Sequence, residues 1–113
     1  MDILVSALEE RLPSLARAVV LLSIYGCEPC VAIRAAMQNV RPGRPDIEFL
    51  VAYFDRRNEA DRAFLERASV AAFPTVWFVD AGKTLDLSAS IRRATPAQAR
   101  ADLESQLGRW TNA

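Results

Sequence analysis

The sequence contains no histidine among its 113 residues. Histidine is the most frequent general base near neutral pH and the most frequent ligand of transition metals. Its absence excludes the serine–histidine and cysteine–histidine arrangements of nucleophilic catalysis. The only two cysteines cannot complete a four-ligand zinc site, and no glycine-rich phosphate loop is present. We therefore expect neither a metal site nor a bound cofactor.

Net charge and long hydrophobic runs are lacking as well. Fourteen basic and fourteen acidic residues balance, and no run of five like charges occurs, so we expect no binding to nucleic acid or to an anionic membrane. The apolar run at residues 18–22, like every other apolar run in the sequence, is far too short to cross a bilayer. Asp2, Glu9 and Glu10 near the start are the reverse of a secretory signal. We therefore expect a cytoplasmic location.

The most informative feature present is Cys27-Glu28-Pro29-Cys30, which follows the apolar residues 19–25. Two thiols at this spacing, where a strand gives way to a helix, can form and break a disulfide with little backbone movement. Cys27 at a helix start would face unsatisfied N–H groups that favour the thiolate, so we expect it to be the nucleophile. Cys30, one turn inside the helix, would be the resolving thiol.

The remaining pattern predicts one α/β domain over residues 1–113, with a mixed central sheet of four or five strands flanked by helices. Buried strands are expected at 18–25 and 47–54. A hairpin is expected from 75–79 and 84–89, with its turn at 80–83. A first helix is expected to begin at a Ser6–Glu9 capping box and to end near Pro13, and a second to follow Cys30 and end at 41–45. Two further helices are expected after Asn58 and after Thr95.

Most aromatic side chains are interpreted as core packing because they fall on predicted buried faces. This set contains Phe64, Trp77, Phe78, Tyr53 and Trp110, with Trp110 facing inward from the last helix together with Ala99, Leu103 and Leu107.

The cysteine motif, the Phe73-Pro74-Thr75 tripeptide before a strand, and Asp55 at the end of the preceding strand together resemble the thioredoxin family. The resemblance covers nearly the whole chain and implies the thioredoxin fold. It also implies a cis Pro74 beside the disulfide, with the backbone of Phe73 pairing with substrate, although residue type alone favours an ordinary trans proline. The activity implied is reduction of protein disulfides, followed by re-reduction through a thioredoxin reductase or glutathione.

Several residues depart from the family pattern. Glu28 stands where thioredoxins usually have glycine, and together with Pro29 it is expected to tune Cys27, because its carboxylate opposes thiolate formation. Leu21 and Val51 replace a buried aspartate and its lysine partner, which removes a proton relay. Tyr25-Gly26 precedes the first cysteine where tryptophan is common.

These departures keep two other functions open. One is a thioredoxin-fold protein-interaction module with little redox turnover, whose affinity comes from a groove at Phe73. The other is an oxidase or isomerase of an envelope compartment, against which Glu28 argues because a nearby carboxylate favours a more reducing couple.

Overall fold

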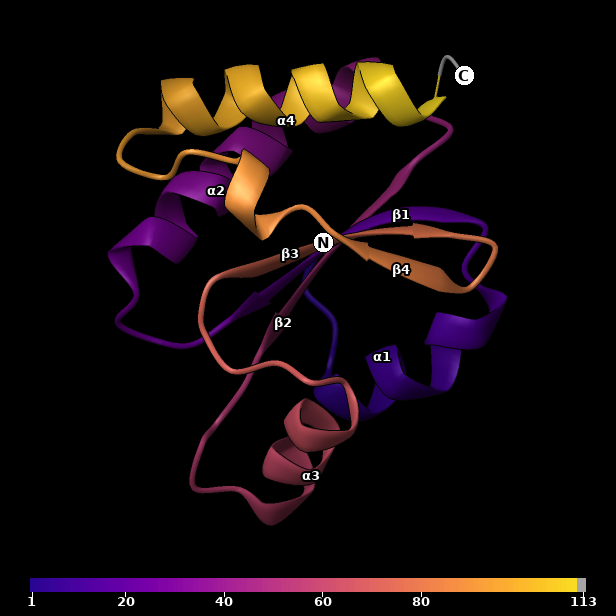
Figure 1. Ribbon diagram of the computed structural model, residues 1–113, viewed down its shortest axis with the longest axis vertical. Coiled ribbons are helices and arrows are strands. Elements are labelled where there is room, and N and C mark those ends of the chain that lie inside the picture. The colour runs from indigo at the N-terminus through magenta and orange to yellow at the C-terminus, as the bar shows by residue number, and fades with distance from the viewer. Residues whose placement is uncertain (112–113) are drawn as a thin grey trace.

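A four-stranded mixed sheet forms the centre of the molecule (Figure 1). The computed structural model describes residues 1–111. The strands β1 (Arg17–Ser23), β2 (Glu48–Tyr53), β3 (Thr75–Asp80) and β4 (Lys83–Asp86) lie in the order β2-β1-β3-β4. β1 is parallel to β2 and antiparallel to β3, and β4 is antiparallel to β3. The predicted fold class is confirmed.

Helices cover both faces of this sheet, as Figure 1 shows. The helices are α1 (Val5–Arg11), α2 (Glu28–Val40), α3 (Glu59–Arg67) and α4 (Pro96–Thr111). Because side chains alternate along a strand, Leu21 packs in one buried cluster with α2 and α4, whereas Leu22 packs in another with α1 and α3. None of the helices in residues 1–111 is long and apolar enough to cross a membrane.

The start of the chain differs from the prediction. The expected capping box at Ser6 does not form, because α1 begins at Val5 with Leu4 as an N-cap that makes no side-chain hydrogen bond. The preceding segment is tied to β2, where the Ile3 N–H donates to the Val51 carbonyl at 2.9 Å. This pairing sets where the helix begins, and Ser6 already lies inside it.

The caps of α3 and α4 agree with the prediction. The side chain of Asn58 accepts from the Asp61 N–H at 3.0 Å, and that of Thr95 accepts from the Gln98 N–H at 3.2 Å. Ala99, Leu103 and Leu107 are buried as expected. The inward position of Trp110 was wrong, since this side chain is 42% exposed. Its helical spacing is right, but the last turn of α4 leaves that face uncovered.

The hairpin is shorter than predicted. β4 ends at Asp86, and Ser88–Ser90 form a 3-10 turn instead of continuing the strand. The Ser88 hydroxyl accepts from the Val76 N–H at 2.9 Å. A side-chain oxygen therefore replaces the backbone carbonyl that a longer β4 would have offered to β3. Ala81 and Gly82 form the two-residue turn with φ of 50° and 78°, as hairpin turns that match the strand twist require.

Candidate redox site

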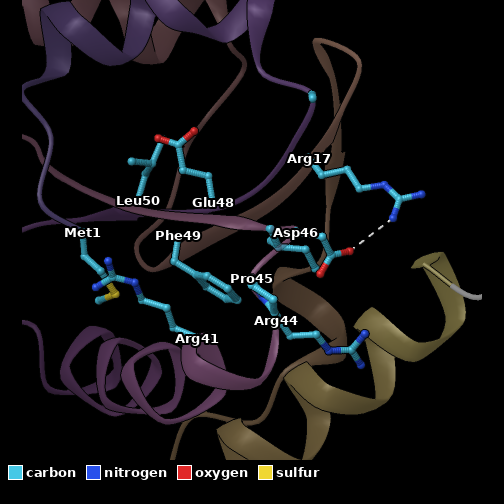
Figure 2. Close-up of a pocket in the computed structure, with 11 residues that line it drawn as sticks. Met1, Arg17, Arg41, Arg44, Pro45, Asp46, Glu48, Phe49 and Leu50 are labelled. Carbon is cyan, nitrogen blue, oxygen red and sulfur yellow. Dashed lines mark hydrogen bonds and ion pairs between the residues drawn. The ribbon is translucent and has the colours of Figure 1, made fainter.

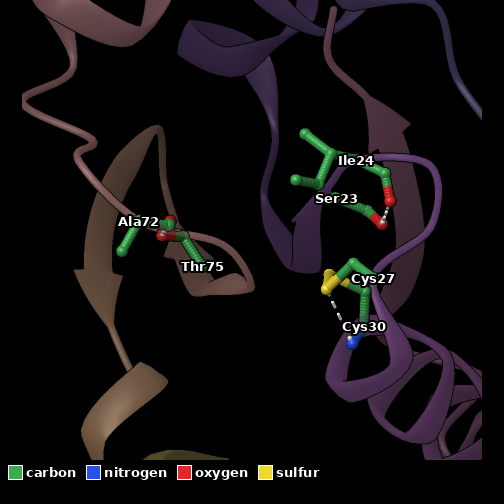
Figure 3. Close-up of a disulfide and its surroundings, with 6 residues drawn as sticks. All are labelled: Ser23, Ile24, Cys27, Cys30, Ala72 and Thr75. Carbon is green, nitrogen blue, oxygen red and sulfur yellow. Dashed lines mark hydrogen bonds between the residues drawn. A yellow bond between two sulfur atoms is a disulfide. The ribbon is translucent and has the colours of Figure 1, made fainter. Parts of the chain in front are cut away.

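Cys27 and Cys30 form a disulfide at the start of α2, with their Cα atoms 5.3 Å apart (Figure 3). Cys27 is the N-cap of the helix, and its sulfur accepts from the Cys30 backbone N–H at 3.2 Å. Cys30 is only 2% exposed, whereas Cys27 is partly exposed. One sulfur is therefore accessible and faces the positive end of the helix, and the other is shielded from water.

The local sequence explains this geometry. β1 ends at Ser23, whose carbonyl accepts from the Phe54 N–H at 2.8 Å. The chain then turns through Gly26, whose φ of 76° suits glycine. Pro29 lies in the first helical turn, where its missing N–H costs no intrahelical hydrogen bond. These features place Cys27 at the N-cap with an extended backbone.

The Phe73-Pro74 segment lies at the same edge of the sheet as the cysteines. Thr75, the first residue of β3, pairs with Leu22 near the end of β1. The Phe73–Pro74 peptide bond is cis, and Pro74 is buried. The Thr75 hydroxyl donates to the Ala72 carbonyl at 2.7 Å and closes the loop, which Figure 3 draws among the surroundings of the disulfide.

No protein-family model matches the chain, and no curated protein matches it in sequence. Solved structures do match. Thioredoxin f2 from Chlamydomonas reinhardtii aligns with 100% of this chain and 97% of its own, with a TM-score of 0.74 and 15% identity. Thioredoxin from Fasciola hepatica aligns with 94% of this chain and 93% of its own (TM-score 0.65, 24% identity). Thioredoxin from Trypanosoma brucei brucei aligns with 95% and 89% (TM-score 0.64, 20% identity).

This chain has the thioredoxin fold. The resemblance inferred from the cysteine motif and the proline loop is thus confirmed for the architecture. At identities of 15% to 24%, the likeness supports the fold, and the chemistry has to be argued from the residues of this chain.

The side chain of Phe73 packs within the molecule and is not presented as a wall of an open groove. Its ring packs against Phe54, with centroids 5.9 Å apart, and the Arg56 guanidinium lies over it at 5.1 Å. The ring belongs to the cluster on the α1 and α3 face of the sheet. What Phe73 can offer a substrate is therefore its backbone.

The buried positions behind the disulfide carry no ionisable group. Leu21 and Val51 are paired across β1 and β2 and are fully buried. Among residues 1–110 the buried polar or charged side chains are Ser23 and Thr75 alone. A proton leaving or reaching Cys30 therefore has no buried carboxylate to use, and water entering from the surface or an exposed group must serve instead.

Ionisable groups lie at the surface near this end of the sheet, and two of them, Glu28 and Arg34, line a cavity with the cysteines. Glu28 is the exposed first residue of α2. Asp55, which follows β2, accepts from both the backbone and the side chain of Arg57, and these hydrogen bonds lower its pKa. The Arg34 guanidinium donates to Asp2 at 2.7 Å, and this contact raises the pKa of Arg34. In the described part of the chain no three potential ligands gather as a metal site would need.

Sequence reasoning missed two residues at this site. Tyr53, predicted to lie in the core, is only half-buried and stacks on Tyr25, with ring centroids 4.7 Å apart. Arg34 follows Cys30 by four residues, a spacing that places both on one helix face. That spacing is the only signal in the sequence that could have indicated it. Tyr53 and Arg34 line one cavity of about 410 Å³ together with Tyr25 and Cys30.

A second cavity, of about 600 Å³, lies at the opposite end of the sheet (Figure 2). Its lining includes Arg17, where β1 begins, and Asp46, just before β2. These two form an ion pair at 3.5 Å, and Glu48 at the rim is paired with Arg11 at 2.7 Å. The cysteines follow the other end of β1, so this cavity takes no part in the redox site.

Proposed function

We propose that this protein is a thiol–disulfide oxidoreductase that reduces disulfide bonds in other proteins, with Cys27 as the nucleophile and Cys30 as the resolving thiol. The observation that carries the proposal is the asymmetry of the pair. The Cys27 sulfur is partly exposed at the N-cap of α2 and accepts the Cys30 N–H, while Cys30 is buried. Accessibility and a hydrogen-bond donor favour attack by the Cys27 thiolate.

The reaction proceeds in two exchanges. The Cys27 thiolate attacks one sulfur of the substrate disulfide, which forms a mixed disulfide and releases the other substrate sulfur as a thiolate that takes up a proton. Cys30 then loses its proton and attacks the Cys27 sulfur, which releases the second substrate thiol and forms the Cys27–Cys30 disulfide. The protein loses two electrons, and the substrate gains them. The oxidised product of this cycle is the disulfide found here.

Substrate binding is assigned to the backbone at Phe73 and to Pro74. Among residues 1–111, no hydrogen bond to another part of the chain occupies the Phe73 N–H or carbonyl. An extended substrate segment can therefore pair with it, as strands pair with open backbone edges. Pro74 supports this arrangement because it lacks an N–H that would compete for the same partners.

Glu28 and Pro29 tune the reaction. The exposed Glu28 carboxylate is adjacent to Cys27 and opposes its deprotonation, which makes the couple more reducing than a neutral residue would. Without an ionisable group at Leu21 or Val51, proton transfer at Cys30 is slow, and turnover is expected to be lower than with a buried relay.

The partners that fit this function are disulfide-containing proteins and an electron donor, either a thioredoxin reductase or glutathione. The thiols would cycle in a reducing compartment, and we place the protein in the cytoplasm on that ground.

The test is insulin reduction with dithiothreitol as donor, combined with the reduction potential of the Cys27–Cys30 pair. Wild-type protein should accelerate insulin reduction, and its potential should lie near the roughly −270 mV of reducing dithiol proteins. Cys30→Ser should trap substrate on Cys27 as a mixed disulfide, while Cys27→Ser should trap none. The reverse trapping result would exchange the two roles, and a strongly oxidising potential would instead indicate an oxidase or isomerase.

The second candidate is an interaction module with the same fold and little redox turnover. The apolar, fully buried pair Leu21 and Val51 favours it, because nothing there assists proton transfer. A pair that forms reversibly but produces no insulin reduction above the dithiothreitol background would support this candidate and overturn the first.

A further inference from the structure

The cavity of about 410 Å³ beside the disulfide has the properties of a small-molecule site. Its volume falls in the range of roughly 300–1,000 Å³ that is usual for such sites. One wall is the Tyr25–Tyr53 stack, and Tyr25 is 81% exposed. The exposed side chain of Val31 adds apolar surface. Both cysteines lie on the lining, so a molecule held here is in reach of the disulfide.

The cavity carries one charge of each sign. Arg34 is the one cation among its lining residues, and Glu28 is the one carboxylate. Both are on α2, six residues apart, which corresponds to about 9 Å along the helix axis. Cys30 and Val31 lie between them. The separation of Glu28 and Arg34 suits a molecule the length of a short peptide, with a charged group at each end and a sulfur between them.

Arg34 has unused hydrogen-bonding capacity. Its Nη2 donates to Asp2 at 2.7 Å, but its Nε is buried with no partner. A guanidinium has five N–H donors, and this side chain is 31% exposed. An unsatisfied buried donor is costly. A ligand carboxylate that accepts from the Arg34 Nε removes this cost, so it binds more tightly than charge attraction alone would allow.

We propose that this cavity binds a low-molecular-weight thiol derived from amino acids, with a carboxylate on Arg34 and an ammonium group on Glu28, and that this thiol reduces the Cys27–Cys30 disulfide. The inference rests on the redox function proposed above and selects the class of electron donor. Protein substrates are left to the Phe73 backbone, which belongs to the loop before β3 and not to this cavity.

The exchange is balanced by two molecules of the thiol. The first attacks the Cys27 sulfur as a thiolate, forms a mixed disulfide with it, and releases Cys30 as a thiolate that takes up a proton. The second attacks the small-molecule sulfur of that mixed disulfide, releases Cys27 as a thiolate that is protonated, and leaves as the symmetrical disulfide. Two small thiols are oxidised, and the protein disulfide gains two electrons and two protons.

The test is the rate at which the oxidised protein is reduced by glutathione, followed by alkylation of the new thiols and mass spectrometry. Mercaptoethanol serves as a neutral thiol of similar chemistry. With wild-type protein the rate should saturate with glutathione and rise linearly with mercaptoethanol. Arg34→Gln should raise the half-saturating glutathione concentration about tenfold, the effect of losing about 1.4 kcal/mol from one charge-assisted hydrogen bond, and leave the mercaptoethanol rate unchanged.

A second variant moves the result in the opposite direction. Asp2→Asn removes the carboxylate that competes for Arg34, so it should lower the half-saturating glutathione concentration while leaving mercaptoethanol unaffected. Arg62→Gln, a matched change at an exposed arginine of α3, should change neither rate. Because Asp2→Asn retains Arg34, it tests the site even if Arg34→Gln folds poorly.

Two results would overturn the assignment. One is a glutathione rate that is linear in concentration for wild type, and the other is a change in Arg34→Gln and Asp2→Asn that affects glutathione and mercaptoethanol equally. The proposed function is judged separately, by insulin reduction with dithiothreitol, which needs no cavity ligand. Retained insulin reduction with unselective glutathione kinetics removes the donor site alone, whereas loss of insulin reduction in wild type removes the function itself.

Discussion

Replacement of Leu21 by aspartate tests whether the region behind Cys30 is as dry as the structure indicates. Leu21 is 0% exposed, between Val51 on β2 and Val76 on β3. It belongs to the buried cluster that β1 shares with α2, which includes Ile33. The resemblance to thioredoxins places an aspartate at this position, so the variant restores that acid without the lysine that would accompany it.

The expected loss of stability has two parts. Removing a fully buried leucine side chain costs about 1.5–3 kcal/mol of apolar transfer free energy. Burying a neutral carboxyl group without a hydrogen-bond partner adds about 1–3 kcal/mol. The sum of about 2.5–6 kcal/mol is a large share of the roughly 5–15 kcal/mol by which domains of this kind are stable. Leu21→Asp should therefore fold only marginally, and we expect this loss at a pH where the new acid is protonated.

The loss should grow as the pH rises. A dry site disfavours the carboxylate, so the pKa of Asp at position 21 lies above its unfolded value of about 3.9 in the folded protein. Between those two pKa values the folded state binds more protons than the unfolded state. Stability is then highest below the unfolded pKa and falls by about 1.4 kcal/mol per pH unit until the folded pKa is passed.

The assay is urea unfolding of wild type, Leu21→Asp and Leu21→Asn at pH 5 and pH 8, followed by circular dichroism. Leu21→Asn is the control, because its side chain has a similar shape but does not titrate. The aspartate variant should lose more stability than the asparagine variant on going from pH 5 to pH 8. Equal pH dependence of the two variants, or a loss below about 1 kcal/mol at pH 5, would refute the view that this strand face is dry.

Two further predictions concern charge and backbone geometry. Glu28→Gln should lower the pKa of the Cys27 thiol by roughly a few tenths of a unit, the effect of one exposed neighbouring charge acting through water, and the difference should shrink in strong salt. Thiolate absorbance of the reduced protein measures this pKa, and an unchanged or higher value would contradict the prediction. Gly82→Ala should cost about 1–3 kcal/mol in thermal unfolding, because φ is 78° and the new Cβ would lie 2.6 Å from the Pro13 carbonyl oxygen. Gly108→Ala, in α4 with open space around it, is the matched control and should stabilise by about 0.5–1 kcal/mol; equal effects would contradict the geometric argument.

Local signals predicted most of the elements well. The apolar runs around Val20 and Leu50 became buried strands, and Asn58 and Thr95 became helix N-caps. These features can be predicted from the sequence because strand burial and capping depend on residues that are close together in it. The errors at Ser6 and Trp110 have the opposite origin. One helix start is set by pairing with β2, and the exposure of Trp110 depends on whether another element covers the end of α4.

The sequence by itself determined the disulfide, because two cysteines separated by two residues at a helix start are brought together by local backbone geometry alone. It also determined that positions 21 and 51, occupied by Leu21 and Val51, have no side chain that can release or accept a proton. Only the tertiary structure decided that Arg34, Tyr25 and Tyr53 share a cavity with the disulfide, and that the Phe73 ring is occupied by Phe54 and Arg56. Those neighbours come from different strands, helices and loops, and packing between distant segments is what sets their distances.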